Sequence, residues 1–371
     1  MNHDRYLRQQ GVEGLAADRL AAMHVVVVGA GAVGNEVVKN LALMGVGAID
    51  VHDFDRVELH NLTRSVFLRE TDVGLPKAAA VAARAQELDP CARIVAVEGD
   101  AWRTLTLSGL ASASVVIGAV DNIEARMRLS QLCLIAGVDF VTAGIDSRYA
   151  SVESFHFSRG SCACYECHLP ESAYRRVAAR YSCGWLRRAL LAEDVIATTA
   201  ITASVAGALA VQAALRVGGD SLVHARRTLV DTRSGVSTTA AMERAVDCAG
   251  CAALSPRPRR VAGGGDWAVA LAAHAPEAEH VLLSDALVFG YACASCGTSD
   301  GARRFVGCRA ADFDDTIMRC QRCRKLGIRV DIRAEATVAD LRALSAGTPL
   351  PVKYLLAQAG THAAVCIDLE D

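Results

Sequence analysis

The sequence predicts an α/β fold in which a doubly wound, mainly parallel, Rossmann-like sheet is combined with a zinc site and a small C-terminal α/β module of zinc-ribbon type. Three observations support this prediction. Short apolar runs alternate with segments of helical spacing, a glycine-rich turn follows the first run, and eight of the 14 cysteines fall into four C-x-x-C pairs. Alternating strands and helices build parallel sheets that are covered on both faces.

The predicted strands and helices follow one another in a regular order. A β-branched run over His24–Val28 precedes the glycine-rich turn, a helix follows over Asn35–Met44, and a buried strand over Gly47–Asp53 completes a βαβ unit. The later elements are helices over Lys77–Glu87 and Glu124–Ala136, and strands over Ala92–Val97, Ser114–Val120 and Asp139–Ala143. Ligands of such sheets bind at the carboxyl ends of the strands, which is where the candidate polar residues occur.

A chain of 371 residues is long for one compact domain. We expect a nucleotide-binding domain over 1–254 and a zinc-binding module over 267–371. The stretch 255–266 is rich in Pro, Arg and Gly and is interpreted as a linker. Within the module, 336–346 is predicted to be helical, and two short strands are predicted to follow it.

Composition excludes several classes of protein. The 39 basic and 41 acidic residues nearly balance, so nothing indicates a nucleic-acid or membrane partner. The almost uncharged segment Val195–Val217 is long enough to span a bilayer, but its threonines and serine favour a helix buried on all sides or lying at a subunit interface. No apolar stretch precedes Val25, so we expect no secretory signal and a cytoplasmic protein without disulfides.

The glycine-rich turn indicates a nucleotide site. Gly29, Gly31 and Gly34 allow a tight turn and a close approach of the backbone to a phosphate, and the N-terminus of the following helix favours anions. Asp53 lies about 20 residues further on, where an NAD-binding acid is expected. The glycines and this acid therefore do not distinguish NAD from ATP.

The residues after the second strand favour ATP. Asp53 or Asp55 can accept hydrogen bonds from ribose hydroxyls. Arg64 and Lys77 supply two cations for a polyphosphate. Asp121 ends a later strand and can hold Mg²⁺. A phosphate-cleaving enzyme requires this set of charges, whereas a nicotinamide enzyme has little need for it.

The motifs GAGAVG, DFDRVELHNLTR, GLPK and AVDN, in this order and spacing, resemble those of the ubiquitin-activating-enzyme superfamily, which includes the bacterial MoeB, ThiF and HesA proteins. The resemblance covers residues 4–254 and implies that 1–254 is an adenylation domain. In this family ATP binds, the C-terminal glycine carboxylate of a small ubiquitin-like or sulfur-carrier protein attacks the α-phosphate, and pyrophosphate leaves.

The resemblance also implies roles for single residues. It assigns phosphate contacts to Gly29, Gly31, Gly34, Asn61, Arg64 and Lys77, the ribose to Asp53, magnesium to Asp121, and places in the same nucleotide site to Asp55 and Asn122. Arg8 resembles the arginine that the family inserts into the partner subunit's active site, which implies a homodimer. Ser65 departs from the pattern, because family members usually have Gln after the arginine at this position.

The C-x-x-C pairs predict two zinc sites. Cys164 and Cys167, together with Cys248 and Cys251, can supply four thiolates for a closed, tetrahedral structural site, and the family has the same arrangement. The second set is Cys293, Cys296, Cys320 and Cys323, whose spacing is typical of a zinc ribbon. This second set is not part of the MoeB or ThiF pattern.

A further cysteine is a candidate nucleophile. Cys183 lies in the segment near 168–195 that corresponds to the family's crossover segment, where some relatives form a thioester or acyl persulfide. Thiolate attack on an acyl adenylate is easy because AMP is a good leaving group. Arg180, Arg187 and Arg188 would lower the pKa of this thiol. A buried structural thiol is the alternative.

The main hypothesis is therefore an activating enzyme for a ubiquitin-like protein that forms an adenylate and then a thioester on Cys183, with a conjugating enzyme as a further candidate partner. A sulfur-carrier adenylyltransferase of the molybdopterin or thiamin type is the nearest alternative. Activation of a peptide, a small-molecule carboxylate or a modified tRNA nucleoside is another. From different classes come an NAD-dependent oxidoreductase and a zinc scaffold with a decayed nucleotide fold.

Overall fold

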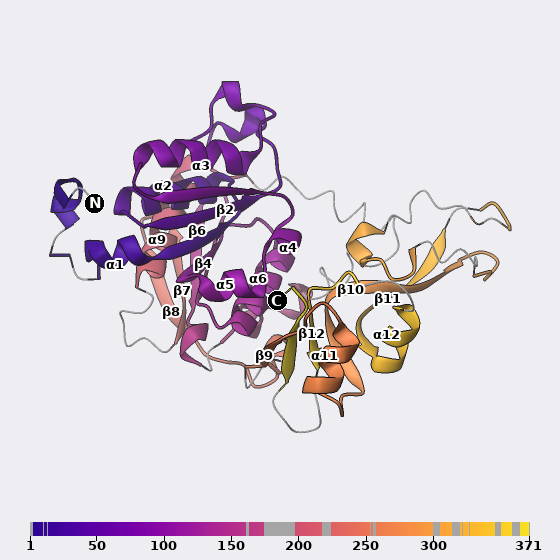
Figure 1. Ribbon diagram of the computed structural model, residues 1–371. Coiled ribbons are helices and arrows are strands. Elements are labelled where there is room, and N and C mark those ends of the chain that lie inside the picture. The colour runs from indigo at the N-terminus through magenta and orange to yellow at the C-terminus, as the bar shows by residue number, and fades with distance from the viewer. Residues whose placement is uncertain are drawn as a thin grey trace. The chain divides into compact units, whose positions relative to one another are not determined.

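The computed structural model describes residues 3–9, 11–12, 14–160, 163–173, 197–216, 224–252, 254, 257–299, 305–313, 320, 322–325, 327–345, 350–357 and 364–370. The chain divides into two compact units (Figure 1). The first is drawn from Met1–Leu169 and Asp194–Ala252, and the second from Pro170–Glu193 and Ala253–Asp371. Each unit has its own sheet and its own hydrophobic core.

The first unit is built from alternating helices and strands along most of its length. In chain order they are η1 (His3–Gln9), α1 (Ala17–Ala22), β1 (His24–Val28), α2 (Ala32–Met44), β2 (Ala48–Asp53), η2 (Leu59–Asn61), η3 (Glu70–Asp72), α3 (Lys77–Leu88), β3 (Arg93–Glu98), α4 (Ala101–Thr104), α5 (Leu107–Ser112), β4 (Val115–Gly118), α6 (Ile123–Ala136), β5 (Phe140–Ile145), β6 (Tyr149–Phe155), η4 (Phe157–Arg159), η5 (Tyr165–His168), α9 (Ala200–Leu215), β7 (Ala225–Asp231), β8 (Ser237–Met242) and α10 (Ala249–Ala252).

The sheet of the first unit has eight strands in the order β3-β2-β1-β4-β5-β6-β7-β8. The strands from β3 to β5 in this order pair in parallel, and β5 to β8 pair antiparallel. The doubly wound, mainly parallel, Rossmann-like sheet is thus confirmed. The strand order reverses between β1 and β4, the place where such sheets bind ligands.

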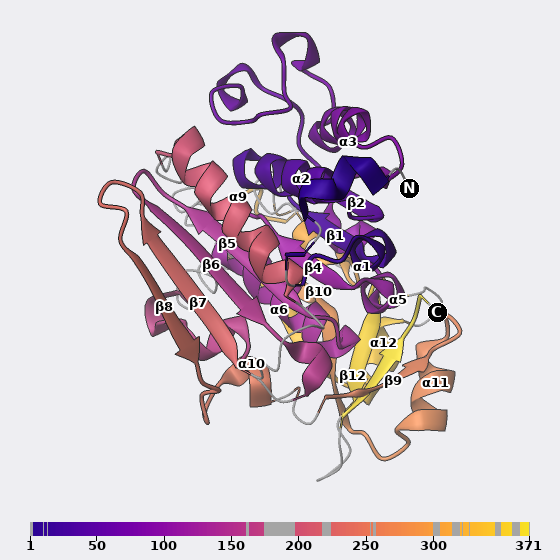
Figure 2. The same ribbon diagram turned by 90° about the vertical axis from the view of Figure 1, so that its left-hand side faces the viewer.

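Helices cover both faces of this sheet, with α2, α3 and α9 on one face and α5 and α6 on the other (Figure 2). After its first residue, His24, the strand β1 is apolar because parallel strands are buried on both faces, and Val25–Val28 are all buried. The predicted elements over 24–28, 77–87 and 124–136 are confirmed, with boundaries that move by at most one residue.

Of the two alternatives expected for Val195–Val217, a helix buried on all sides or one lying at a subunit interface, the first is wrong for α9. Instead of being buried on all sides, it buries one stripe against α2 and the sheet and exposes the opposite stripe, where Ile201 is 66% exposed. Gly207 permits the close contact with α2, because a Cβ atom there would lie 2.4 Å from Cβ of Glu36. None of the helices in the described part of the chain is both long and apolar enough to cross a membrane.

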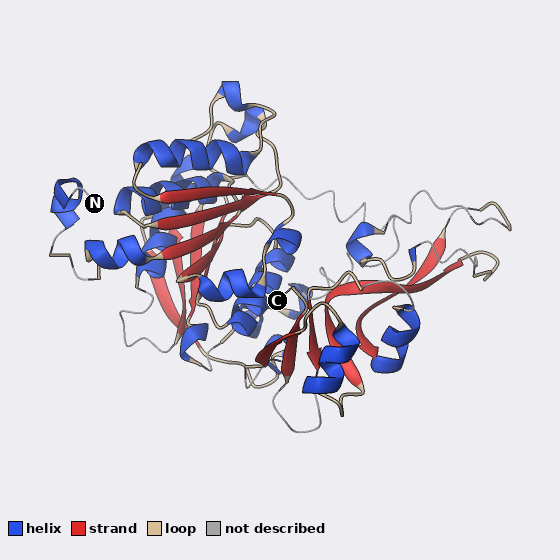
Figure 3. Cartoon of the chain, viewed as in Figure 1, coloured by secondary structure: helices blue, strands red, loops and turns tan. Residues whose placement is uncertain are grey.

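The second unit is built on a five-stranded sheet in the order β11-β10-β12-β13-β9 (Figure 3). Its elements are β9 (Arg259–Ala262), α11 (Trp267–His274), β10 (His280–Cys293), η7 (Ala310–Asp312), β11 (Ile328–Thr337), α12 (Val338–Leu344), β12 (Tyr354–Ala357) and β13 (Val365–Asp368). Both helices bury apolar side chains in one core, including Trp267, Leu271 and Leu341.

Two boundaries in the second unit differ from the prediction. Residues 259–262 of the predicted linker form β9, which pairs in parallel with β13, so this edge strand belongs to the sheet despite its Arg-rich sequence. The predicted helix over 336–346 is the shorter α12, because Ala336 and Thr337 complete β11. Thr337 caps α12 through its side-chain oxygen, which ends the strand and begins the helix.

Candidate functional site

The glycine-rich turn joins β1 to α2 and lies against the chain that follows β4. Gly29 has φ +100°, and a Cβ atom there would lie 2.6 Å from the carbonyl oxygen of Ala119. A Cβ atom at Gly34 would lie 1.9 Å from the Gly29 carbonyl oxygen, so backbone packing requires both glycines. A Cβ atom at Gly31 would meet no atom of the described chain within 4 Å. The start of α2 is therefore open to a ligand, and a helix N-terminus favours an anion.

Asp53, the last residue of β2, fixes this turn. One of its carboxylate oxygens accepts a hydrogen bond from the backbone N–H of Ala30 at 2.6 Å, and the other accepts one from the N–H of Asp55 at 2.7 Å. Burial raises the pKa of Asp53, while these two hydrogen bonds and the charge of Lys77 oppose the rise. The carboxylate therefore links the glycine turn to the loop after β2 through hydrogen bonds to both.

Lys77 begins α3 and lies at the same end of the sheet. Its Nζ atom is 2.7 Å from Oδ2 of Asp55, and its backbone N–H donates to the carbonyl oxygen of Asp55 at 2.9 Å. The Lys77 side chain is 12% exposed and that of Asp55 is 48% exposed. The structure thus brings Asp53, Asp55 and Lys77 together beside the glycine turn.

The loop that follows β2 carries Asn61 and Arg64. Asn61 is buried, and its Oδ1 atom accepts a hydrogen bond from the backbone N–H of Glu58 at 2.9 Å. The guanidinium group of Arg64 donates to the carbonyl oxygen of His60 at 2.9 Å. Ser65, at the position where the family usually has Gln, is buried.

Asn35, in the first turn of α2, links this loop to the glycine turn, and the sequence analysis did not identify it. Its Nδ2 atom donates to the carbonyl oxygens of Ala30 and Gly31 at 2.7 and 3.0 Å. Its Oδ1 atom accepts from the backbone N–H of Phe67 at 3.0 Å. The available signal was its presence in a predicted helix, since Asn has a low helix propensity.

Asp121 and Asn122 follow β4, next to Ala119 and hence near the glycine turn. Asp121 is exposed, and its Oδ1 atom accepts a hydrogen bond from Nδ2 of Asn122 at 3.2 Å. Asn122 is the N-cap of α6, because its Oδ1 atom accepts from the backbone N–H of Ala125 at 2.8 Å. The side chain of Asn122 therefore orients α6 as well as the neighbouring carboxylate.

Arg126 is a second residue that the sequence analysis did not identify. Its Nη2 atom donates to the carbonyl oxygens of Val120 and Ala143, at 2.9 and 3.2 Å, and so connects the ends of β4 and β5. Gly144 makes room for it, because a Cβ atom there would lie 2.8 Å from the guanidinium nitrogens. Nothing in the sequence distinguished Arg126 from Arg128 on the same predicted helix.

Arg8 lies at the opposite end of the unit from the glycine turn. It is an exposed residue of η1, and its neighbour Tyr6 donates a hydrogen bond to Asp89, just after α3, at 2.7 Å. A Cβ atom at Gly45, just after α2, would lie 2.7 Å from the Tyr6 ring. Because α2 has 13 residues, about 20 Å of helix separates η1 from the turn in the same chain.

The first two C-x-x-C pairs meet in one cluster. Sγ of Cys164 lies 3.9 Å from that of Cys167 and 3.6 Å from that of Cys248, and Cys167 lies 3.5 Å from Cys251. Four thiolates around Zn²⁺ would be about 3.8 Å apart, given a Zn–S distance of about 2.3 Å. Cys164, Cys248 and Cys251 are buried, so these residues fit a closed structural zinc site.

The other two pairs meet in a cluster in the second unit. Sγ of Cys293 lies 3.5 Å from that of Cys323, and Sγ of Cys296 lies 3.7 Å from that of Cys320. These four atoms also lie within 4.8 Å of one another and fit a tetrahedral metal. Cys293 and Cys320 are buried and Cys296 is exposed, so this cluster lies nearer to the surface than the first.

The candidate nucleophile Cys183 lies outside the described residues. So do its neighbours Arg180, Arg187 and Arg188.

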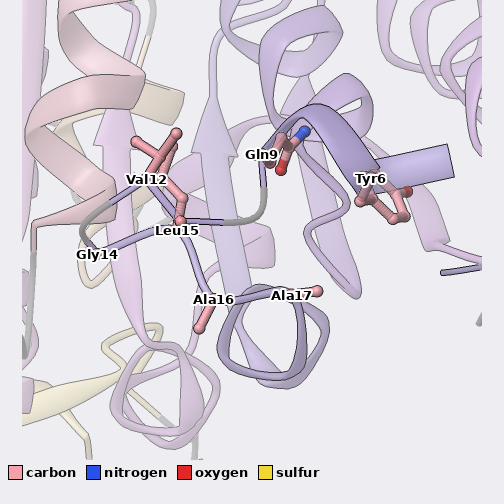
Figure 4. Close-up of a pocket in the computed structure, with 8 residues that line it drawn as sticks. Tyr6, Gln9, Val12, Gly14, Leu15, Ala16 and Ala17 are labelled. Atoms are coloured by element: carbon pink, nitrogen blue, oxygen red, sulfur yellow. The ribbon is translucent and has the colours of Figure 1, made fainter. Parts of the chain in front are cut away.

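A cavity of about 290 Å³ occurs in the N-terminal segment (Figure 4). It is lined mainly by apolar and small residues, and none of the predicted nucleotide-site residues lines it. Its lining includes Tyr6, Gln9, Val12, Leu15 and Ala16.

The fold and the site define a Rossmann-like α/β protein with a glycine-rich turn at its switch point and a cluster of four cysteines beside its core. The model of the ThiF family matches residues 3–249. The chain belongs to the ThiF family.

Curated relatives share part of their length with the chain. It is 35% identical over 174 residues to "SAMP-activating enzyme E1" of Haloferax volcanii, covering 46% of this chain and 63% of the relative. It is 35% identical over 176 residues to "Sulfur carrier protein adenylyltransferase" of Thermus thermophilus, covering 45% and 64%. It is 32% identical over 164 residues to "Adenylyltransferase and sulfurtransferase MOCS3" of Aedes aegypti, covering 44% and 37%. The chain therefore matches less than two thirds of each of these relatives.

Solved structures share the fold. The crystal structure of E. coli MccB with MccA-N7isoASN has a TM-score of 0.53 and 20% identity, covering 68% of this chain and 75% of that chain. The structure of the microcin C7 biosynthetic enzyme MccB with N-formylated MccA has a TM-score of 0.54 and 22% identity, covering 67% and 75%. At this identity the likeness concerns the fold alone.

Proposed function

We propose that the chain catalyses the ATP-dependent adenylation of the C-terminal glycine carboxylate of a small ubiquitin-like or sulfur-carrier protein. The main supporting observation is that the Asp53 carboxylate accepts hydrogen bonds from both the glycine turn and the loop after β2, where Asp55 pairs with Lys77. The relatives from Haloferax volcanii and Thermus thermophilus are named for the activation of such proteins, and the ThiF family model matches most of the chain.

Different residues of the described chain would bind different parts of the nucleotide. The open backbone at Gly31 and the N-terminus of α2 would face phosphate oxygens. Lys77 would leave its ion pair with the exposed Asp55 and bind a phosphate. Arg64 would likewise leave the carbonyl oxygen of His60 and bind a phosphate. Asp53, whose second oxygen faces the loop after β2, would accept from the ribose. The carrier's carboxylate oxygen would attack the α-phosphorus, and the bond to pyrophosphate would break.

Asp121 is the proposed ligand of Mg²⁺. It is an exposed carboxylate in the turn that follows β4, near the glycine turn, and Mg²⁺ prefers oxygen ligands. The ion would supply charge neutralisation on the phosphates. Asn122 and Arg126 would hold the carboxylate in place, since one donates to Asp121 and the other binds the carbonyl oxygen of Val120 next to it.

Arg8 is the proposed trans residue of a homodimer. In its own chain it lies beyond the far ends of α2 and α3, so it cannot reach the glycine turn without a large rearrangement. A second copy could present its Arg8 to the phosphates, where the guanidinium would stabilise negative charge.

We further propose that both cysteine clusters hold structural zinc, whose role is to fix the four thiolates of each cluster.

After adenylation, we propose that the Cys183 thiolate attacks the acyl carbon of the carrier adenylate, forming a thioester and releasing AMP. A sulfur-carrier adenylyltransferase would stop at the adenylate or pass it to another sulfur nucleophile. The test is mass spectrometry of candidate carriers ending in Gly-Gly after incubation with ATP. An adenylated carrier supports the proposal. A thiol-sensitive adduct on wild type but not on Cys183→Ala supports the thioester, and an adenylate without an adduct refutes the thioester alone.

A further inference from the structure

The second unit contains two C-x-x-C turns, Cys293–Thr298 and Cys320–Lys325, which we call the first and second knuckle. Both have the same pattern of backbone hydrogen bonds. In the first, the N–H of Gly297 donates to the carbonyl of Cys293 at 2.9 Å, and the N–H of Cys293 donates to Thr298 at 3.0 Å. In the second, the N–H of Arg324 donates to the carbonyl of Cys320 at 2.9 Å, and the N–H of Cys320 donates to Lys325 at 3.0 Å. Gly297 and Arg324 therefore occupy equivalent positions.

Both positions are left-handed, but only one of them is glycine. The φ angles are +69° for Gly297 and +59° for Arg324, which is the only residue other than glycine with a positive φ in the described part of the chain. An L-residue is strained in this conformation, whereas glycine adopts it freely. The second knuckle thus keeps an arginine where folding alone favours glycine, which indicates that its side chain serves a purpose outside the fold.

The surroundings of Arg324 are basic. Arg322, Lys325 and Arg329 are also exposed, and the described residues at 293–299, 320, 322–325 and 327–330 include no acid. Arg322 spans the two knuckles, because its guanidinium group donates to Oγ1 of Thr298 at 3.2 Å. Asp331, which follows on β11, forms an ion pair with Arg333 instead. We name these four cations, at 322, 324, 325 and 329, the basic knuckle surface.

We propose that the basic knuckle surface docks an acidic segment of a protein partner. Four clustered cations on a chain of net charge −2 form a local field that attracts carboxylates and weakens with salt. A single-stranded nucleic acid fits less well, because it needs aromatic rings to stack its bases. The nearby rings of Tyr291 and Phe313 instead pack on one another at 6.0 Å inside the unit. The proposal goes beyond adenylation and does not depend on it.

The test uses the full-length, zinc-loaded chain and a fluorescein-labelled deca-glutamate peptide, with binding followed by fluorescence anisotropy at low and high salt. Replacing Arg324 by Gly should raise the thermal midpoint of the chain, because the strained position is relieved. The same change should weaken peptide binding about fivefold, as expected for the loss of one interfacial charge. Arg322→Gln and Arg324→Gln should weaken it similarly, whereas Arg342→Gln, an exposed arginine on α12, should not.

Stability and binding should therefore respond to Arg324→Gly in opposite directions. Unchanged peptide affinity in Arg324→Gly and Arg322→Gln would overturn the docking surface. A thermal midpoint or zinc content that falls in Arg324→Gly would overturn the argument from strain. Tighter binding of a labelled oligodeoxynucleotide of equal charge would assign the surface to nucleic acid and refute the acidic protein segment.

Discussion

Oδ1 of Asn35 accepts a hydrogen bond from the backbone N–H of Phe67 at 3.0 Å, although 32 residues separate the two in sequence. The same side chain donates to the carbonyl oxygens of the glycine turn. One buried amide therefore fixes the turn and the loop that carries Asn61 and Arg64 relative to each other.

Replacing Asn35 by Ala should lower both stability and ATP affinity. The buried N–H of Phe67 would lose its acceptor, and an unsatisfied buried group costs about 1–3 kcal/mol. Urea unfolding and equilibrium ATP binding would measure the two effects. Gln212→Ala, on the exposed stripe of α9, is the matched control. Wild-type ATP affinity in Asn35→Ala would contradict the proposed role of this link.

Asp53→Asn should weaken ATP binding at least tenfold, and it should also destabilise the turn. The carboxylate accepts two backbone hydrogen bonds, whereas an amide presents one acceptor and one donor, so either Ala30 or Asp55 would face an N–H group. Isothermal titration with ATP measures the loss. Asp18→Asn, an exposed acid of α1, should leave affinity unchanged. Equal affinities in wild type and Asp53→Asn would refute the assignment.

Each cysteine cluster should hold one zinc ion. Metal analysis by mass spectrometry should find two ions in wild type and one each in Cys164→Ser and Cys296→Ser. The buried first site should contribute more stability, so Cys164→Ser should lower the thermal midpoint further than Cys296→Ser does. Cys91→Ser, an exposed cysteine outside both clusters, should keep both ions. Two ions in Cys164→Ser would contradict the first site.

His52 should make the chain less stable in mild acid. Burial lowers the pKa of His52 from 6.5 to about 4, with the charge of Asp50 opposing the change. Between these values the unfolded chain binds a proton that the folded chain does not, so stability falls as the pH drops from 6.5 to 4. The slope from this residue is at most about 1.4 kcal/mol per pH unit. Urea midpoints at several pH values should show that slope in wild type and in the exposed control His60→Asn, but not in His52→Asn. An unchanged slope in His52→Asn would place the effect elsewhere.

Mixing two inactive variants tests Arg8 in trans. Arg8→Ala and Asp121→Ala should each fail alone. A randomly mixed dimer population should recover about one quarter of the wild-type activity, because half of the dimers would contain one intact composite site. If Arg8 acted within its own chain, mixing would restore nothing. Sedimentation of the mixture confirms that dimers are present.

The sequence was sufficient for the parallel half of the sheet, because β1 to β5 each contain apolar, β-branched residues and are bounded by turns or helices. It did not predict β6, β7 and β8, in which polar and charged residues interrupt the apolar ones; β8 includes the exposed run Ser237–Ala241. The residues of the site were found where they end or closely follow strands, as with Asp53, the last residue of β2, and Asp121, three residues after β4. Asn35 and Arg126 were missed because they act by contacts across 32 and 17 residues, which local spacing does not reveal.

The most direct test of the proposed adenylation is ATP–pyrophosphate exchange with candidate carrier proteins ending in Gly-Gly, compared between wild type, Asp121→Ala, Cys183→Ala and the control Asp18→Ala. We expect exchange that requires the carrier, is lost in Asp121→Ala, and survives in Cys183→Ala and Asp18→Ala. Absence of exchange with every carrier, together with measurable NAD binding, would contradict this expectation and favour an oxidoreductase.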